Sequence, residues 1–252
     1  MAGTNENKHM KFRIAALLLS ALFFLQACSR KEYKNNFNDP ILFSKTVKEL
    51  NNVVMQNGFP PIIASRNYAY ACIAAYETVV LGDNRFQTLA GQIEHLPAMP
   101  KLDTADVNFQ YASMLAFCKV GEAVTFPKGS MKEYVNRLDS IANADNMSAS
   151  MQEASKRLAD SVTSHILRWS KNDNYAQTRT AEKYNITNEE GRWVPTAPSY
   201  AQALEPHWNE IRTMIMDSAS QFTPPRPPAF DMKNKESKFY KEVMAVKNAG
   251  DS

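Results

Sequence analysis

The feature that most constrains the fold is a segment from Ile62 to Leu81 that is apolar on most sides when drawn as a helix. Its apolar positions include Ile63, Tyr70, Ile73, Ala74 and Val80. A helix that is apolar all round is stable only when other elements surround it. The sequence therefore predicts a helical bundle with residues 62–81 near its centre.

Four further segments have the three- and four-residue apolar spacing of helices that bury one face. They run from Asp39 to Asn57, from Asp103 to about Ala123, from Met131 to Ala144 and from about Ser148 to Ser170. We expect Asp39 and Asp103 to cap their helices. Residues 85–102 contain a glycine and two prolines and predict a loop with one short helix. Because no segment has the pattern of a strand, the predicted fold class is all-α.

A stretch rich in proline and aromatic residues follows these helices. Residues 191–230 hold seven of the thirteen prolines and two of the three tryptophans. Prolines fix φ and aromatic rings bury wide faces, so this stretch predicts a long extended strap pinned onto the helical body. The residues expected to brace it are Trp193, Pro195, Pro198, Tyr200, Pro206, Trp208 and Phe222.

Two helices are expected at the end of the chain, one over residues 207–218 after Pro206 and one over residues 237–249. The proline run at 224–228 could instead dock as a polyproline ligand on an aromatic groove. A stiff strap within the chain is the favoured interpretation for an exported protein.

The first residues have the pattern of an export signal. Met10-Lys11-Phe12-Arg13 precedes twelve mostly apolar residues, fewer than the ~20 that span a membrane as a helix. Leu25-Gln26-Ala27-Cys28 then resembles a bacterial lipoprotein box, which implies cleavage before Cys28 and lipid attachment there. The protein would lie in the cell envelope, held to the periplasmic or outer-membrane face. The alternative is an ordinary signal peptide with an incidental cysteine.

The predicted organisation is a signal peptide (1–27), a polar tether (28–38), a helical domain (39–222) and a proline-rich connector with a terminal helix (223–252). Removing residues 1–27 takes away three basic side chains and one acidic one, which lowers the net charge from +3 to +1. A chain this close to neutral lacks the dense positive charge of nucleic-acid-binding proteins. Cys72 and Cys118 lie in apolar helical patterns, which favours two buried free thiols over a disulfide.

Scarce histidines limit the chemistry that the chain can carry. His95, His165 and His207 are far apart, and no pair has the spacing that places two metal ligands on one helix face. We expect His165 and His207 to be structural. The sequence contains no nucleophile elbow, phosphate-binding glycine loop, dinucleotide fingerprint or paired-cysteine motif. The carboxylate pairs at 103/106 and 189/190 are typical of helix starts and loops, so no catalytic, cofactor-binding or metal-binding residue is predicted.

One family resemblance is carried by the proline-rich stretch. The pattern is Gly-x-Trp-x-Pro-Thr-x-Pro from Gly191, Ala203-Leu204-x-Pro-x-Trp, Ile211-Arg212 and Gln221-Phe222, with Ser65-Arg66-x-Tyr68-Ala69-Tyr70 earlier. It resembles the vanadium-dependent haloperoxidases and the related type-2 phosphatidic acid phosphatases of exported bacterial proteins. The resemblance implies a helical protein that holds vanadate or phosphate in its carboxy-terminal half.

The resemblance also implies a lysine seven residues before Arg-Pro, a Ser-Gly-His, and a later arginine followed by a histidine. Here Arg226-Pro227 has Ala219 at the lysine position, and Ser164-His165 lacks the glycine. The sequence therefore predicts the amino-terminal, non-catalytic half of such a protein, which would be inactive alone, bind no cofactor and have the missing catalytic half as its partner. We expect the inward faces of residues 62–81 and 103–123 to be partly uncovered. The alternative is a stand-alone lipid-anchored binding protein.

Overall fold

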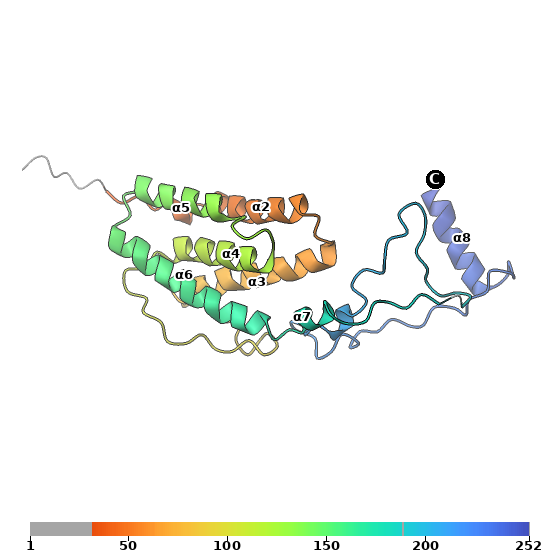
Figure 1. Cartoon of the computed structure of the whole chain (residues 1–252). Helices are drawn as coiled ribbons and strands as arrows, with labels where there is room; N and C mark the ends of the chain where they lie inside the picture. Colours follow the sequence, from red (N-terminus) through yellow and green to blue (C-terminus); the bar gives the residue numbers. More distant parts are fainter. Residues whose placement is uncertain (1–31, 188, 252) are drawn as a thin grey trace, which may run out of the picture.

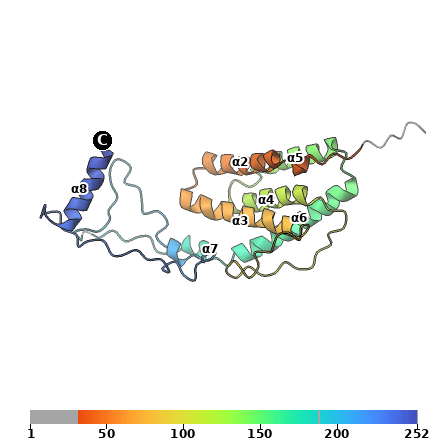
Figure 2. The same cartoon turned by 180° about the vertical axis from the view of Figure 1, so that it is seen from behind.

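The computed structural model describes residues 32–187 and 189–251, so the predicted signal peptide and Cys28 lie outside the described residues. Within these ranges the chain forms helices and irregular segments and no strand, which confirms the all-α prediction. A bundle of helices occupies one end of the molecule, and an arm with a single helix extends from it (Figures 1 and 2). None of the described helices combines the length and apolarity needed to cross a membrane.

The bundle begins with α2 (Pro40–Gln56) and α3 (Pro61–Val80). The Asp39 side chain accepts a hydrogen bond from the backbone N–H of Ile41 at 2.9 Å, which confirms the predicted cap. α4 (Phe109–Val124), α5 (Lys132–Ala144) and α6 (Ala149–Ser170) complete the bundle. The first of these starts later than predicted because Asn108, and not Asp103, caps it through a 2.8 Å bond from the N–H of Tyr111.

The centre of the bundle is α4, which packs mainly against α3 and α6. Residues 111–118 of α4 are all buried. The expectation that the inward face of this helix is partly uncovered was therefore wrong. Gly121 continues the same helix where Leu50 of α2 comes close, since a Cβ there would lie 2.8 Å from Leu50 Cδ2. The core is closed by side chains of the bundle itself.

Residues 85–102 form a loop along the bundle and contain no helix, contrary to the short helix predicted there. Hydrogen bonds to side chains on α3 and α6 fix the position of this loop. Glu77 on α3 accepts from the Thr88 hydroxyl and the Leu89 N–H, both at 2.7 Å. His165 and Trp169 on α6 bond to the carbonyls of Pro97 and Glu94 at 2.9 and 3.1 Å.

The described part of the predicted tether is packed on the bundle. Phe37 is buried within a short 3-10 helix, η1 (Asn36–Asn38). The Asp145 carboxylate accepts from the backbone and side chain of Asn36 at 3.0 and 2.5 Å. Phe37 therefore belongs to the core and Tyr33 packs against it, so residues 33–38 are held on the bundle.

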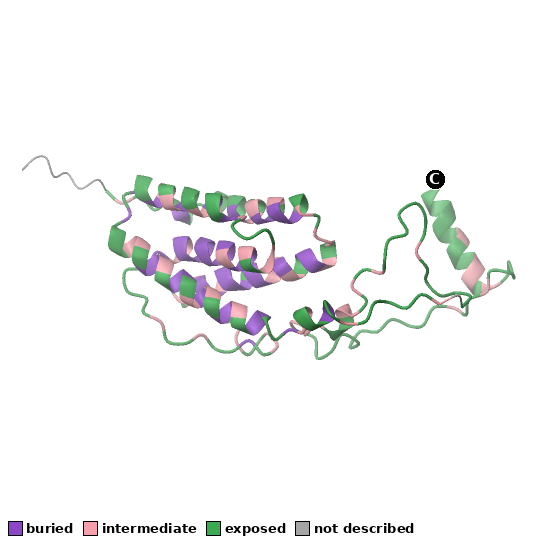
Figure 3. Ribbon diagram, in the orientation of Figure 1, coloured by how far each residue is buried: buried purple, intermediate pink, exposed green. Residues whose placement is uncertain are grey.

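The arm comprises residues 179–251 and follows the short helix α7 (Tyr175–Thr178). Among the described residues of the arm, the regular elements are a 3-10 turn, η2 (Trp208–Glu210), and a last helix, α8 (Lys238–Gly250). The predicted terminal helix is confirmed. The prediction of a helix over residues 207–218 is wrong. The backbone of Ile211 is extended, and the N–H of Arg212 donates to the carbonyl of Asp173, just after the end of α6. Burial is concentrated in the bundle, and the arm is mostly exposed (Figure 3).

Candidate functional site

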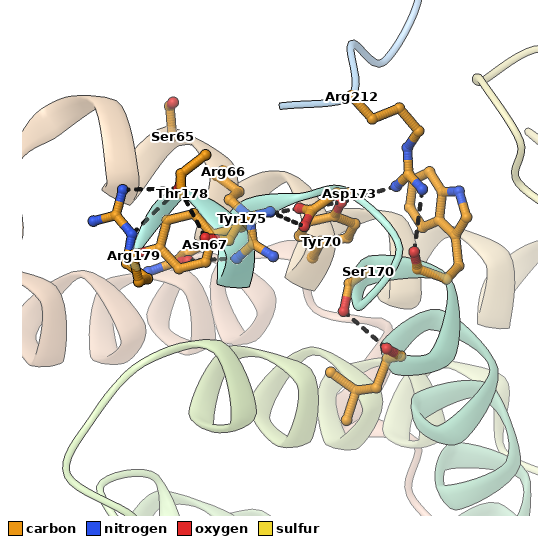
Figure 4. Close-up of polar contacts among 12 residues, drawn as sticks. Ser65, Arg66, Asn67, Tyr70, Ser170, Asp173, Tyr175, Thr178, Arg179 and Arg212 are labelled. Carbon is orange, nitrogen blue, oxygen red and sulfur yellow. Dashed lines mark hydrogen bonds and ion pairs between the residues drawn. The ribbon is translucent and has the colours of Figure 1, made fainter. Parts of the chain in front are cut away.

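A buried polar cluster lies where the arm leaves the bundle, and Asp173 is at its centre (Figure 4). This residue follows α6 and has a side chain that is only 2% exposed. Its Oδ2 accepts hydrogen bonds from Arg66 Nε at 2.6 Å and from the Tyr70 hydroxyl at 2.8 Å. Its Oδ1 accepts from the N–H of Tyr175 at 3.0 Å, which fixes the start of α7.

Arg66 and Tyr70 come from the same face of α3, because they are four residues apart. The Arg66 side chain is 9% exposed, and its guanidinium lies over the rings of Tyr70 and Tyr175 at 4.8 and 4.2 Å. Burial, and then the negative charge of Asp173, raise the pKa of Tyr70 well above its usual value. Tyr70 is therefore a neutral hydrogen-bond donor at physiological pH.

Arg212 brings the arm back to this cluster. Its guanidinium donates to the Tyr70 hydroxyl at 2.9 Å and to the Trp169 carbonyl at 3.2 Å, and it stacks 4.3 Å from the Trp169 ring. Its backbone N–H donates to the Asp173 carbonyl at 2.9 Å. We call Arg66, Tyr70, Trp169, Asp173 and Arg212 the Asp173 clasp. It joins α3, the end of α6 and the arm.

The clasp is suited to holding segments together more than to catalysis. The Asp173 carboxylate is committed to an arginine, a phenol and a backbone N–H, so it offers no free base or nucleophile. A cavity of about 450 Å³ adjoins the clasp, and its lining residues include no histidine, lysine or cysteine. The cluster is a buried ion pair between Arg66 and Asp173, flanked by aromatic rings, and it joins the arm to the bundle.

A second set of polar contacts lies farther along the arm. Arg179, just after α7, forms a two-pronged ion pair with Glu205, with Nη1 2.7 Å from Oε1. His207 Nε2 lies 2.7 Å from the Glu182 carbonyl, and its Nδ1 lies 2.7 Å from Glu210 Oε1. The carbonyl of Glu182, and then the carboxylate of Glu210, raise the pKa of His207.

The predicted strap has the irregular backbone expected of it, but most of it is not pinned to the bundle. Trp193 is 47% exposed, Tyr200 66% and Phe222 77%. Pro198 and Pro206 are exposed as well, whereas Pro195 and Trp208 are half-buried. The strap closes mainly on itself: Tyr184 packs edge-on to Trp193, and a Cβ at Gly191 would lie 2.8 Å from the Phe230 ring.

The other residues singled out in the sequence have structural roles or none. His165 is buried and hydrogen-bonded, as predicted, and His207 is held between two oxygens. His95 lies on the surface with a left-handed backbone. Both described cysteines are free, but only Cys118 is buried; burial raises its pKa to about 12. Cys72 is exposed on the outer side of α3, which corrects the expectation that it is buried.

Cys72 lies at the wall of an apolar groove between η1, α2, α3 and α4, with a volume of about 480 Å³. Its lining is mainly aromatic and aliphatic: Phe37, Phe43, Ala75, Tyr76, Val79, Phe86 and Met114. This groove is the part of α3 that the bundle leaves uncovered. It lies beside the exposed Cys72, whereas inward residues of α3 such as Tyr70 and Ala74 are fully buried, so the expectation of an uncovered inward face was wrong for α3 as well.

The sequence pattern did not identify the clasp as a unit. A signal was present in α3, where Arg66 places a charge in a largely apolar helix, one turn from Tyr70. A charge in such a helix requires a buried partner. The identity of that partner, 107 residues away, follows only from the packing of α6 against α3.

Comparison with solved structures finds a match to a protein described as the first bacterial vanadium-dependent iodoperoxidase. The TM-score is 0.80 and the sequence identity is 34%, over 88% of this chain and 55% of that chain. The two proteins share a fold. No protein-family model and no curated protein matches the sequence. The similarity supports the haloperoxidase resemblance, and the chain spans about half the length of the iodoperoxidase.

The clasp does not fit an oxyanion such as vanadate. The arginines of the clasp surround a carboxylate, which repels an anion, and no histidine lies beside them. Arg226 of the Arg-Pro dipeptide is exposed on the arm. Among the described residues no group of three or more metal-ligating side chains occurs.

Proposed function

We propose that this chain is the amino-terminal helical scaffold of a haloperoxidase-like or acid-phosphatase-like exported protein, and that it is inactive without an oxyanion-binding half. The observation that carries this proposal is the shared fold at 34% identity, which extends over 88% of this chain but only 55% of the iodoperoxidase. Further support is that the sequence contains neither a lysine seven residues before Arg-Pro nor a Ser-Gly-His, the motifs that the family resemblance implies.

The exposure of the arm supports a missing partner surface. Of the seventeen large hydrophobic side chains that are exposed in the described residues, thirteen lie between Tyr184 and Val246. Exposed apolar side chains concentrated in one segment of the chain provide area that another polypeptide could cover. The bundle, by contrast, has a closed core. We therefore assign the arm, and not the bundle core, as the surface that the catalytic half would cover.

Activity of the purified chain tests the proposal. The chain without residues 1–27 is incubated with vanadate, hydrogen peroxide and iodide or bromide, and separately with a phosphomonoester. We expect turnover at the level of the buffer alone. Turnover well above that level in either assay would overturn the scaffold proposal, because the oxyanion site would then lie within these residues.

The coding sequence downstream of codon 252 separates the scaffold from a stand-alone binding protein. A lysine seven residues before Arg-Pro together with Ser-Gly-His, in the same or a shifted frame, would support the scaffold. An unrelated stretch would favour the binding protein. The observation that makes this second candidate worth keeping is the apolar groove of about 480 Å³ beside Cys72, which is large enough for a small apolar ligand.

We also propose that Cys28 carries lipid and holds the protein to the periplasmic or outer-membrane face of the cell envelope. The support is the export signal that ends at Leu25-Gln26-Ala27-Cys28. Cells expressing the full chain are fed radiolabelled palmitate and the protein is partitioned in detergent. Label and detergent-phase partitioning should be lost in Cys28→Ser and kept in Cys72→Ser. Label that persists in Cys28→Ser would contradict lipidation at this residue.

A further inference from the structure

His207 bridges two segments at the base of the arm. Its Nε2 is 2.7 Å from the backbone oxygen of Glu182, and its Nδ1 is 2.7 Å from Oε1 of Glu210. The first oxygen belongs to the segment that leaves α7, and the second belongs to η2 on the returning segment. The ring therefore fastens the outgoing and returning parts of the arm to each other.

The chemistry of the two partners decides the protonation state that fits this geometry. A backbone carbonyl accepts hydrogen bonds and cannot donate, and an ionised carboxylate also only accepts. A neutral imidazole has one N–H and one nitrogen lone pair, so one of its nitrogens would face an oxygen lone pair at 2.7 Å. An imidazolium has an N–H on both nitrogens and satisfies both contacts.

We propose that His207 is a pH-sensitive latch between the two segments of the arm. The protonated ring donates to both the Glu182 carbonyl and the Glu210 carboxylate, whereas the neutral ring can donate to only one of these oxygens and releases the other. All the groups involved lie in the described residues, so the inference is independent of the haloperoxidase proposal. The released contact is local to residues 182 and 207–210. The bundle does not depend on it.

The charged groups around the latch keep the rest of the arm base closed when the ring is neutral. The two-pronged ion pair of Arg179 and Glu205 spans the same two segments and does not involve the His207 ring. The carboxylates of Glu210 and Glu182 add negative charge near the ring, and Lys183 is the next residue along the outgoing segment. Release of His207 therefore loosens the turn at η2 without detaching the arm.

The direction of the pH dependence follows from the raised pKa of His207 in the folded chain. A group whose folded pKa lies above its unfolded value, about 6.5 for histidine, stabilises the structure fully below the unfolded pKa. That stabilisation is lost as the pH rises through the folded pKa. The latch is closed in acid and opens toward alkaline pH. A cavity of about 320 Å³ lined by His207, Tyr184 and Trp193 would change shape in the same interval.

The test is an NMR titration of the imidazole signals of the intact chain from pH 5.5 to 8.5, with His207 assigned by its absence in His207→Gln. Hydrogen exchange of the Glu210 and Ile211 amides is followed at the same time, corrected for intrinsic rates, because both amides bond within η2. We expect a His207 pKa above 6.5 and a loss of amide protection through that pKa. By linkage, the protection factor of these amides should fall by a factor of ten raised to the difference between the measured His207 pKa and 6.5.

Three variants separate the latch from a general loosening of the arm. Glu210→Gln keeps an oxygen acceptor without the charge and should move the His207 pKa toward 6.5. His207→Gln should make protection at Glu210 and Ile211 independent of pH. His95→Gln changes an exposed histidine outside the latch and should leave both readouts as in the parent chain. A His207 pKa at or below 6.5, or protection that ignores pH in the parent, would overturn the proposal.

Discussion

Helices α6 and α8 start in the same way and end in different surroundings. Each is preceded by a serine whose Oγ accepts from a backbone N–H three residues on, at 3.1 Å in both cases. In α6, nine residues are buried, whereas α8 has no buried residue. Local signals are thus sufficient to start a helix in the bundle and in the arm. The difference is that only the bundle supplies a core for its helices to cover.

The sharpest test of this contrast is one substitution made in both regions. Phe117→Ala removes a fully buried ring from α4 and should lower the free energy of unfolding by about 3–5 kcal/mol. Phe222→Ala removes a ring that is 77% exposed and should change it by less than about 0.5 kcal/mol. Urea unfolding followed by circular dichroism at 222 nm measures both. Similar losses for the two variants would show that the arm is packed in solution.

Breaking the clasp should lower the free energy of unfolding nearly as much as removing a ring from the core. Asp173→Ala leaves Arg66 nine-tenths buried without its ion pair, and we expect a loss of about 3 kcal/mol, at the lower end for a broken buried pair because a cavity adjoins it. Asp217→Ala in the arm removes an exposed carboxylate that accepts a hydrogen bond from Gln221 Nε2, and it should cost less than about 0.5 kcal/mol. The same unfolding assay compares them, and equal losses would contradict an anchoring role.

Adding a methyl group at a closely packed glycine should have a smaller effect on stability, again in the bundle and not in the arm. Gly121→Ala places a methyl group against Leu50, whose carbons lie 2.8 and 2.9 Å from the new Cβ, and should destabilise the bundle by about 1–3 kcal/mol. Gly250→Ala in α8 meets no atom within 4 Å. It should be neutral or raise the helicity of α8, because alanine favours helices over glycine. A neutral Gly121→Ala would show that α2 can move away from α4.

The smallest effect on stability is expected from removing the serine caps of α6 and α8. Ser148→Ala should lower global stability by about 1 kcal/mol, because α6 unfolds together with the bundle. Ser237→Ala removes the equivalent bond from α8, and we expect increased amide exchange within residues 238–241 but no change in the global unfolding midpoint. A shift of the global midpoint in Ser237→Ala would indicate that α8 and the bundle unfold as one unit.

Sequence patterns predicted the bundle well because each of its long helices has an apolar face and local stop and start signals. They failed where a distant partner decides the backbone. Residues 207–218 have helical spacing, yet Arg212 bonds to Asp173, Trp169 and Tyr70, which pulls the chain out of the helix after Glu210. Residues 85–102 likewise follow buried groups such as Glu77 and not their own propensity.

The candidate site was harder to predict than the fold. Within the clasp, Tyr70 and Arg212 are separated by 142 positions, so no spacing rule connects them. The aromatic strap was conspicuous in sequence, but aromatic content does not say whether a surface is already covered. Trp193 and Phe222 are 47% and 77% exposed, although both were expected to brace the strap.

The clasp also sets an order for folding. Arg212 can bond to Tyr70 and Asp173 only after α6 has docked on α3, since that docking brings these two acceptors together. Contacts between residues so far apart in the chain form late, because the loop between them must first be closed. The arm should therefore attach to a bundle that has already formed, and nascent chains released before residue 212 should already contain the folded core.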